Sequence, residues 1–321
     1  MRIKRLLSVF VLIILIVWFV TYINTHLNEF KQIKIIHYNH LFYISVLTII
    51  FLVSNGLQLR YLLEPFKIRL PFKEWFGLSV VSTFGNYLTP FRGGMGLRAI
   101  FLKNKYQFSY SLFVSTLAAA YIIVFLVNSL IGVLSMMLIY LFYNLFSKII
   151  LTLFLTLFLF CLFIVIFSPK FYQTKYKLIN KFLNIVNGWS LIKSNYKILT
   201  FTSFFTFLNV AFSVLIMYLE FSAFGINISW TQSLFLTIVS TFSIFLSITP
   251  GSLGIKESIL VFSANLINIS STQALSVAIL DRVINLIIIL ILGPIFSYIL
   301  MRDSKSHKMQ SRKNDKKWIK S

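Results

Sequence analysis

Thr89-Pro90-Phe91-Arg92-Gly93-Gly94-Met95-Gly96-Leu97-Arg98 ends an apolar run that begins at Trp75, and Thr249-Pro250-Gly251-Ser252-Leu253-Gly254-Ile255-Lys256-Glu257 ends another that begins at Trp230. Proline and glycine interrupt a helix at both places. A short apolar piece follows each break, 99–102 in the first case and 258–267 in the second. Irregular backbone at membrane depth persists only where protein or water covers it. Each stretch therefore predicts a re-entrant helical hairpin.

The two broken stretches resemble each other. Both contain Thr-Pro, a glycine-rich turn, and then glycine, a hydrophobic residue and a cation: Gly96-Leu97-Arg98 and Gly254-Ile255-Lys256. One long apolar span precedes each hairpin and one follows it, which predicts repeats at about 41–143 and 199–300. Inverted repeats with broken helices at matching positions indicate the midplane site of a transporter. The alternative is a chance similarity between two connectors rich in glycine and proline.

The composition predicts that lipid is the main solvent of the whole chain. Hydrophobic residues make up 58% of the 321 residues and charged residues 12%, and the mean hydropathy is +0.86. A soluble domain carries about 25% charged residues, so this chain cannot cover a water-facing globule. Spans of about 20 apolar residues cross a membrane as helices. Six full spans are predicted: 6–23, 41–63, 110–143, 149–167, 201–221 and 272–300.

The predicted fold is therefore an all-α polytopic membrane protein with six full spans and two re-entrant hairpins in inverted repeats, or with eight transmembrane helices. Residues 1–301 form a single transmembrane domain, and residues 302–321 form a basic cytoplasmic tail. The span 6–23 is interpreted as a retained helix, because no cleavage site with small residues follows it. The span 110–143 is long for one upright helix. Tilt, a kink near Gly132, or two segments could explain its length.

The net charge of +22, from 30 basic and 8 acidic residues, orients the protein. Such a charge often indicates nucleic acid, but here it lies in loops and a tail beside apolar spans. With a cytoplasmic N-terminus, 20 basic residues fall in inside loops and 3 in outside loops. This is a strong positive-inside signal. The sequence predicts a bacterial cytoplasmic membrane protein with both termini in the cytoplasm, anionic lipids as partners and no nucleic-acid partner.

The broken turns favour an anionic ligand. Glycines allow a close approach of the backbone, and helix starts present free N–H groups. Arg92, Arg98 and Lys256 add formal charge, and a guanidinium fork suits phosphate. Arg98 and Lys256 are expected to approach one cavity from opposite membrane sides, with positive charge in excess near the first hairpin. Alternatively, Arg92 and Arg98 mark only the cytoplasmic end of a helix.

Asp281-Arg282 lies about ten residues into the last span, where unpaired charges cost at least roughly 2.5 to 3.5 kcal/mol each. Adjacent residues point to different sides of a helix, so each needs its own partner, and Lys256 and Glu257 are the candidates. A purely structural ion-pair network is the alternative. Glu220 and Arg60 lie near span ends and are expected to reach an interface. The predicted substrate-binding residues are Asn86, Pro90, Arg92, Gly93, Gly94, Gly96, Arg98, Pro250, Gly251, Gly254, Lys256, Glu257, Asp281 and Arg282.

Asn86-x-x-x-Pro90 with Gly96-Leu97-Arg98, followed by 250–257, resembles the lysylphosphatidylglycerol synthase transmembrane region family, also called flippase-like integral membrane proteins. The usual second motif of that family reads Pro-Gly-Gly-Leu-Gly-hydrophobic-Arg-Glu, whereas this chain has Ser252 and Lys256 at two of its positions. Arg282 matches a later basic residue of the family. The family often has an acidic-basic pair in the helix after the first motif, but 110–147 carries no charge.

The resemblance implies a role with lipids, above all the flipping of aminoacylated phosphatidylglycerol. In the fused members a separate soluble domain attaches the amino acid, and this chain is expected to lack it and not to be an enzyme. The cargo implied is an anionic phospholipid or a polyprenyl-linked glycolipid. The alternative is a non-transporting accessory subunit that holds a lipid-modifying enzyme or a glycosyltransferase. No catalytic residue, metal or cofactor is predicted.

Overall fold

The computed structural model describes residues 34–167 and 195–318, with a few isolated positions outside these ranges. The predicted span 6–23 lies outside the described residues, apart from the isolated positions near its end. The described residues form helices and no strands. In chain order the elements are α3 (Tyr38–Leu63), η1 (Glu64–Phe66), α4 (Phe72–Leu88), η2 (Pro90–Arg92), α5 (Gly94–Tyr106), α6 (Tyr110–Tyr143), α7 (Lys148–Phe167), α9 (Tyr196–Ala223), α10 (Trp230–Thr241), η4 (Phe242–Leu246), η5 (Pro250–Ser252), α11 (Ile255–Asn265) and α12 (Ser271–Trp318).

Five of the described helices are long and apolar enough to cross a membrane, namely α3, α6, α7, α9 and α12. They coincide with the predicted spans, and the all-α polytopic fold is confirmed. The long span 110–143 is one unbroken helix of 34 residues. The Ser109 side chain caps its start by accepting from the Leu112 N–H, and Asn144 ends it in the left-handed conformation. At 1.5 Å per residue it is about 51 Å long, against a hydrocarbon core of about 30 Å.

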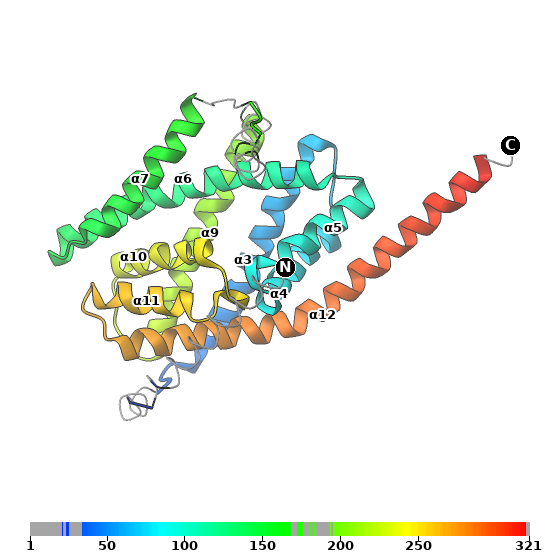
Figure 1. Ribbon diagram of the computed structural model, residues 1–321. Helices are drawn as coiled ribbons and strands as arrows, with labels where there is room; N and C mark the ends of the chain where they lie inside the picture. The colour runs from blue at the N-terminus through cyan, green and yellow to red at the C-terminus, as the bar shows by residue number, and fades with distance from the viewer. Residues whose placement is uncertain are drawn as a thin grey trace.

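The two broken segments form helical hairpins that approach each other from opposite ends of the bundle (Figure 1). In the first hairpin α4 packs on α5, and in the second α10 packs on α11. Helix α12 runs along both hairpins, and the turns η2 and η5 contact each other where the hairpins meet. Helices α3 and α9, which begin the two predicted repeats, pack together. This arrangement is the one that inverted repeats require.

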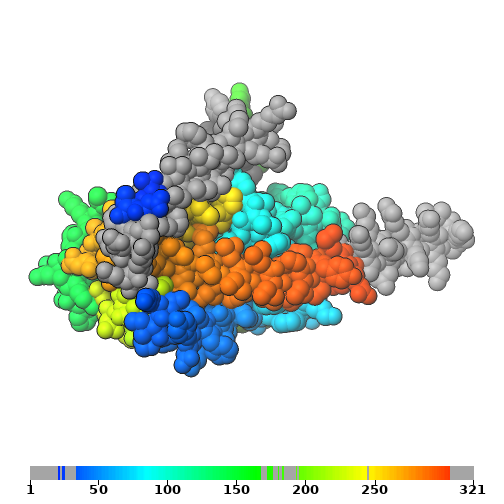
Figure 2. All heavy atoms as spheres, turned by 90° about the horizontal axis from the view of Figure 1, so that it is seen from below, coloured from blue at the N-terminus to red at the C-terminus, as the bar shows by residue number. Residues whose placement is uncertain are grey.

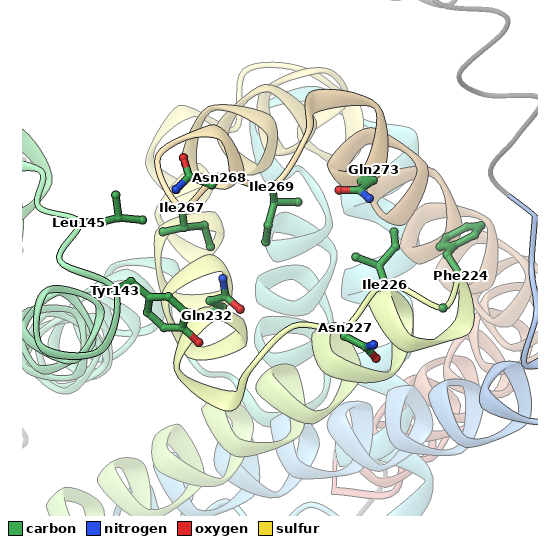
Figure 3. A pocket seen from close by; sticks show the side chains of 11 residues that line it. Tyr143, Leu145, Phe224, Ile226, Asn227, Gln232, Ile267, Asn268, Ile269 and Gln273 are labelled. Atoms are coloured by element: carbon green, nitrogen blue, oxygen red, sulfur yellow. The ribbon is translucent and has the colours of Figure 1, made fainter.

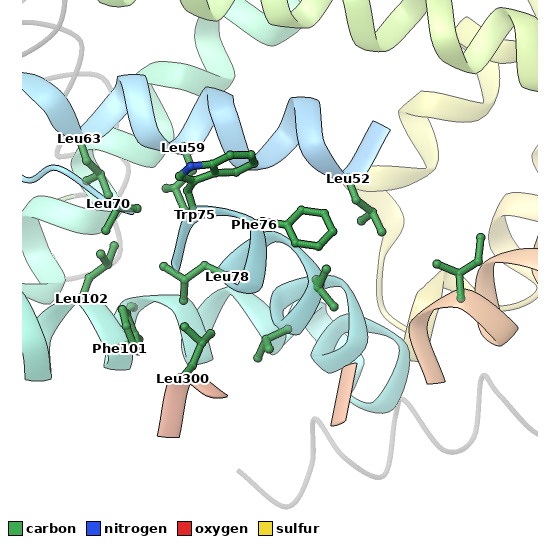
Figure 4. Packing of buried hydrophobic residues seen from close by; sticks show 14 of the residues in the cluster. Leu52, Leu59, Leu63, Leu70, Trp75, Phe76, Leu78, Phe101, Leu102 and Leu300 are labelled. Atoms are coloured by element: carbon green, nitrogen blue, oxygen red, sulfur yellow. The ribbon is translucent and has the colours of Figure 1, made fainter. Parts of the chain in front are cut away.

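Helix α4 is enclosed by protein, as a hairpin limb in a membrane must be. Ten of its 17 residues are buried. Figure 4 shows Trp75 and Leu78 of α4 packed among Leu59 of α3, Leu102 of α5 and Leu300 of α12. An apolar helix facing lipid would instead leave much of its surface uncovered. Apolar contacts with α3 and α12 therefore hold the first hairpin in place.

Helix α7 contrasts with α4, because only Ile150, Phe154, Cys161 and Ile164 are buried among its 20 residues. Most of its other side chains are apolar and suited to lipid. Helix α12 also reaches the molecular surface: it crosses the face shown in Figure 2, with α3 beside it. Bulky apolar side chains of α12 are exposed at the membrane-spanning level, among them Val283, Ile287, Leu290 and Ile291. At the same level Asp281 and Arg282 of α12 point the other way, toward α11.

Candidate functional site

The turns at the two hairpin tips have the same backbone conformation. In each, the proline is followed by two residues in the left-handed region: Phe91 and Arg92 with φ of 55° and 53°, and Gly251 and Ser252 with φ of 58° and 53°. Arg92 and Ser252 are 160 residues apart, as are the two prolines. Left-handed residues other than glycine cost roughly 1–2 kcal/mol each. Two matching strained turns support an internal repeat over a chance similarity between connectors.

A polar cavity of about 480 Å³ lies between the hairpin tips. Arg92 and Arg98 of the first hairpin line it, and so does Lys256 of the second. The expectation that Arg98 and Lys256 face a common cavity therefore agrees with the structure. Six of the fourteen predicted residues line this cavity: Asn86, Arg92, Arg98, Gly251, Lys256 and Asp281.

Two ion pairs join the second hairpin to α12. The Lys256 Nζ lies 2.6 Å from Asp281 Oδ2, and the Arg282 guanidinium lies 2.5 Å from Glu257 Oε1. Adjacent residues of α12 thus take separate partners on α11, as predicted. The Lys256 side chain is 38% exposed, whereas that of Glu257 is 7% exposed. The first pair is open to the cavity, and the second is buried behind it.

Glu257 also holds the turn that precedes α11. Its Oε2 accepts a hydrogen bond of 2.7 Å from the Gly254 N–H, and Arg282 donates through Nη2 to the Gly251 carbonyl at 3.2 Å. The predicted role of Gly254 as a free N–H donor for an anion is therefore wrong, because Glu257 occupies that donor. Glu257 and Arg282 fix the geometry of the turn and place Lys256 at the cavity wall.

The two cations that the first hairpin presents to the cavity have hydroxyl partners instead of carboxylates. Arg98 is 9% exposed, and its Nε donates to Ser82 Oγ at 3.0 Å. Arg92 donates through Nη1 to the Tyr121 hydroxyl at 3.3 Å. No ion pair to either arginine is found within the described part of the chain. Glu74, at the other end of this hairpin, is paired with Lys105 at 2.6 Å.

This difference leaves positive charge in excess near the first hairpin, while the second is nearly balanced by its two ion pairs. A buried cation without a counter-charge is costly unless a ligand supplies one. A bidentate oxyanion such as phosphate matches the fork of an arginine. The cavity wall formed by the first hairpin is thus built to accept negative charge.

Several predicted residues serve the packing of the hairpins and do not line the cavity. A Cβ at Gly94 would overlap the Ser82 carbonyl oxygen of α4, so this glycine lets the two limbs of the first hairpin touch. A Cβ at Gly96 would meet nothing within 4 Å, and that residue is exposed. The predicted residues outside the cavity lining are Pro90, Gly93, Gly94, Gly96, Pro250, Gly254, Glu257 and Arg282.

Glu220 lines the cavity, although the sequence predicted that it would reach an interface. That prediction is wrong: the residue is 1% exposed and lies in α9, facing Lys256 and Asp281. A lone acid within the apolar run 201–221 was itself the signal, because an ionisable residue inside a span usually faces the bundle interior. Arg60, for which the same prediction was made, is exposed.

Uncharged polar groups complete the wall and were also missed. Several buried polar atoms without a hydrogen-bond partner in the described part of the chain cluster here, although buried polar groups usually have one. Their side chains come from α4, α6, α9 and α10, so the polar lining extends around the cavity. These atoms are Asn86 Oδ1, Asn128 Oδ1, Asn209 Oδ1, Glu220 Oε1 and Ser240 Oγ. Such a wall suits a polar headgroup better than acyl chains.

A second cavity, of about 600 Å³, opens between the loops that follow α6, α9 and α11. Figure 3 shows Gln232, Asn268 and Gln273 around it, together with Tyr143 and several apolar side chains. None of the described residues that line it carries a formal charge, and none belongs to the two motifs. Gln232 and Gln273 already bond to backbone N–H groups at helix starts. The charged cavity between the hairpin tips is the stronger candidate site.

Two broken helical hairpins whose tips meet at a charged cavity inside a bundle of long apolar helices define a polytopic membrane protein. Residues 5–293 match the family model described as the lysylphosphatidylglycerol synthase TM region. The chain belongs to this family, as its two motifs had indicated, and is a multi-pass membrane protein of lipid metabolism. No curated protein and no solved structure matches the chain.

Proposed function

We propose that this protein binds the phosphate-bearing headgroup of an anionic lipid between its two hairpin tips and moves it across the membrane. The observation that carries the proposal is the pair Arg92 and Arg98, which line a cavity of about 480 Å³ without a carboxylate partner. The headgroup phosphate supplies the missing negative charge. The acyl chains remain in the surrounding lipid.

The size and depth of the cavity support a headgroup as the ligand. Ligand pockets usually measure about 300–1,000 Å³, so this cavity accommodates a headgroup but not a whole lipid. Its cations come from hairpins that enter the bundle from opposite ends. A headgroup between them can therefore exchange contacts with one hairpin for contacts with the other, which is the geometry that alternating access needs.

The proposal includes an orientation and a compartment. The distribution of basic residues favours a bacterial cytoplasmic membrane with both termini inside, and it places the loop that opens the first hairpin in the cytoplasm. The protein acts as a non-enzymatic translocase, and its cargo is an anionic phospholipid or a polyprenyl-linked glycolipid. The rival is an accessory subunit that binds such a lipid without moving it and holds a lipid-modifying enzyme or a glycosyltransferase.

The first test measures binding. Purified protein in nanodiscs is titrated with short-chain phosphatidylglycerol and, separately, with short-chain phosphatidylcholine. Arg98→Gln should weaken binding of the anionic lipid by about tenfold or more, because a hydrogen bond to a charged group contributes roughly 1.5–3 kcal/mol. Lys103→Gln is the matched control, since it removes the same charge from an exposed position of α5. Equal affinities of the two variants would contradict the proposed site.

The second test measures movement. Proteoliposomes carry fluorescent phosphatidylglycerol or a fluorescent polyprenyl phosphate, and an impermeant quencher reports the lipid left in the outer leaflet. The proposal expects faster exchange between leaflets with the wild-type protein than with Arg98→Gln. Binding that depends on Arg98 without any exchange, for lipids of both kinds, would favour the accessory subunit over the translocase.

A further inference from the structure

Glu220 is a carboxyl group of the cavity wall that the proposed function does not use. It is 1% exposed, and its Oε1 has no hydrogen-bond partner among the residues that the structure describes. It lines the same cavity as Asp281 and Lys256, and its carboxyl group faces both of them. Three ionisable groups from α9, α11 and α12 thus meet at one point of the cavity.

The cations within reach do not suffice for both acids. Lys256 is paired with Asp281 at 2.6 Å, and the neighbouring Arg282 is held by Glu257. Two carboxylates in contact repel each other, and such a pair usually retains one proton between them. An ionised Glu220 would add a second buried negative charge against one lysine, and a buried charge without its own partner is unfavourable.

The surroundings supply no other counter-charge. Helices α3 and α10, which also pack against α9, present only uncharged side chains to the cavity within its described lining. Glu257 and Arg282 are engaged with each other behind the wall. The ionisable groups that line the same cavity are Tyr87, Arg92, Arg98, Tyr121, Glu220, Lys256 and Asp281. Arg92 and Arg98 belong to the first hairpin and are bonded to hydroxyl groups of α6 and α4.

We infer that Glu220 and Asp281 form a proton-binding site that controls Lys256, so that the protein exchanges a proton during its cycle. With one proton present, Glu220 donates its O–H to Asp281, and the pair holds Lys256 with a single negative charge, so that an anion in the cavity can compete for the lysine. When that proton leaves through the cavity, both carboxylates hold Lys256, and the anion loses a cation. The proton-binding site stands on the geometry alone, whereas its link to lipid release rests on the proposed function.

The proton can be observed without any lipid. In infrared spectra of the detergent-solubilised protein at neutral pH, a protonated carboxyl gives a carbonyl stretch that shifts in heavy water. The wild-type protein should show this band, and Glu220→Gln should lack it. Glu64→Gln, at an exposed position after α3, is the control that should retain it. The absence of the band from wild-type protein, or its retention in full by Glu220→Gln, would overturn the inference.

A further variant tests whether the proton is shared. In Asp281→Asn the remaining acid, Glu220, has Lys256 to itself and should ionise, so the band should disappear. If burial alone kept Glu220 protonated, Asp281→Asn would retain the band, and the shared site would be wrong. Thermal unfolding of each variant shows whether it is folded before its spectrum is interpreted. If either Glu220→Gln or Asp281→Asn does not fold, the other variant is used alone, because both are expected to lose the carboxyl band.

The link to the ligand has a separate readout. Affinity for short-chain phosphatidylglycerol should be highest at low pH and fall as the pH rises through loss of the shared proton. Glu220→Gln keeps a neutral donor beside Asp281, so its affinity should stay level over that range. A carboxyl band without any lipid binding would contradict the proposed function alone. If wild type and Glu220→Gln bound the lipid with the same pH profile, the proton would not control lipid binding, but the proton-binding site itself would stand.

Discussion

Replacing Glu257 by glutamine removes one charge from the buried pair with Arg282 and keeps an oxygen that can still accept from the Gly254 N–H. Arg282 is then left with the Gly251 carbonyl as its remaining polar partner. The side chains of the pair are 16% and 7% exposed, so solvent compensates little. Removing one partner of a buried pair typically costs about 3–5 kcal/mol, and we expect a loss of stability in that range.

Asp281→Asn is the matched comparison, because it removes the same type of charge one residue away from Arg282. The Lys256 side chain is 38% exposed, and Glu220 can replace the lost carboxylate. Because a carboxylate then remains beside Lys256, the change leaves no buried charge unpaired and should cost less stability than Glu257→Gln. The structure therefore predicts that the two acid-to-amide changes differ clearly in their effect on stability, although each breaks one ion pair.

The assay is unfolding in mixed micelles as the fraction of a denaturing detergent rises, followed by tryptophan fluorescence. Free energies of unfolding are compared at one pH for the wild-type protein, the two single variants and the double variant Glu257→Gln/Arg282→Met. The double variant should recover part of the loss, because it no longer buries an unpaired charge. A Glu257→Gln protein within about 1 kcal/mol of the wild type, or a double variant no more stable than the single one, would refute the reasoning.

Two other predictions concern packing and topology. Gly94→Ala should destabilise the first hairpin by roughly 1–3 kcal/mol, because its Cβ overlaps the α4 backbone, while Gly96→Ala should be neutral or slightly stabilising in the same unfolding assay. In a background where the buried cysteine is replaced by serine, impermeant maleimide applied from outside should label His37→Cys and Asn268→Cys but not Lys73→Cys. External labelling of Lys73→Cys would overturn the inverted topology.

The helix breaks and the ion pairs were predictable because local chemistry determines both. Proline and glycine end helices wherever they occur, and adjacent charges on one helix face different neighbours. The repeat followed from the same residues, with its offset of 160 set by Pro90 and Pro250. Even the partners of Asp281 and Arg282 could be named, since few charges exist within the spans to choose from.

The burial of Glu220 was not predictable from its distance to the end of an apolar run. Helix α9 extends to Ala223, and the carbonyl of that residue accepts hydrogen bonds from the N–H groups of Ile36 and His37. The helix therefore continues past Glu220, and that residue is buried because it faces Lys256 of α11 and Asp281 of α12. Depth in a bundle depends on which distant segment folds over a helix, and no local pattern records that contact.

The roles of the glycines were mispredicted for a related reason. A glycine shows that something approaches the backbone closely, but it does not show what. At Gly94 the neighbour is the α4 backbone, and at Gly254 the N–H is taken by Glu257. The anion-binding groups that remain are side chains. The specificity of the cavity then depends on arginine and lysine geometry more than on helix starts.

The unequal charge of the two hairpins leads to a last prediction. Lys256 has two acids that can hold it, Asp281 and Glu220, so either single amide variant leaves one carboxylate available. Only the double variant Glu220→Gln/Asp281→Asn frees Lys256 from both. We expect single variants to bind anionic lipid much as the wild type does at low pH. The double variant should bind it about tenfold more tightly or better, since a charged hydrogen bond contributes roughly 1.5–3 kcal/mol and each 1.4 kcal/mol is tenfold.

The same double variant should exchange lipid between leaflets more slowly, because nothing then competes with the headgroup for Lys256. Tighter binding with slower exchange is a combination that loss of folding cannot produce, and titration in nanodiscs with the quencher assay in proteoliposomes measures both. The first hairpin allows no equivalent variant, because Arg98 has no carboxylate partner among the described residues that a substitution could remove. If the double variant binds no more tightly than the singles, Lys256 does not reach the ligand, and the anion contacts the first hairpin alone.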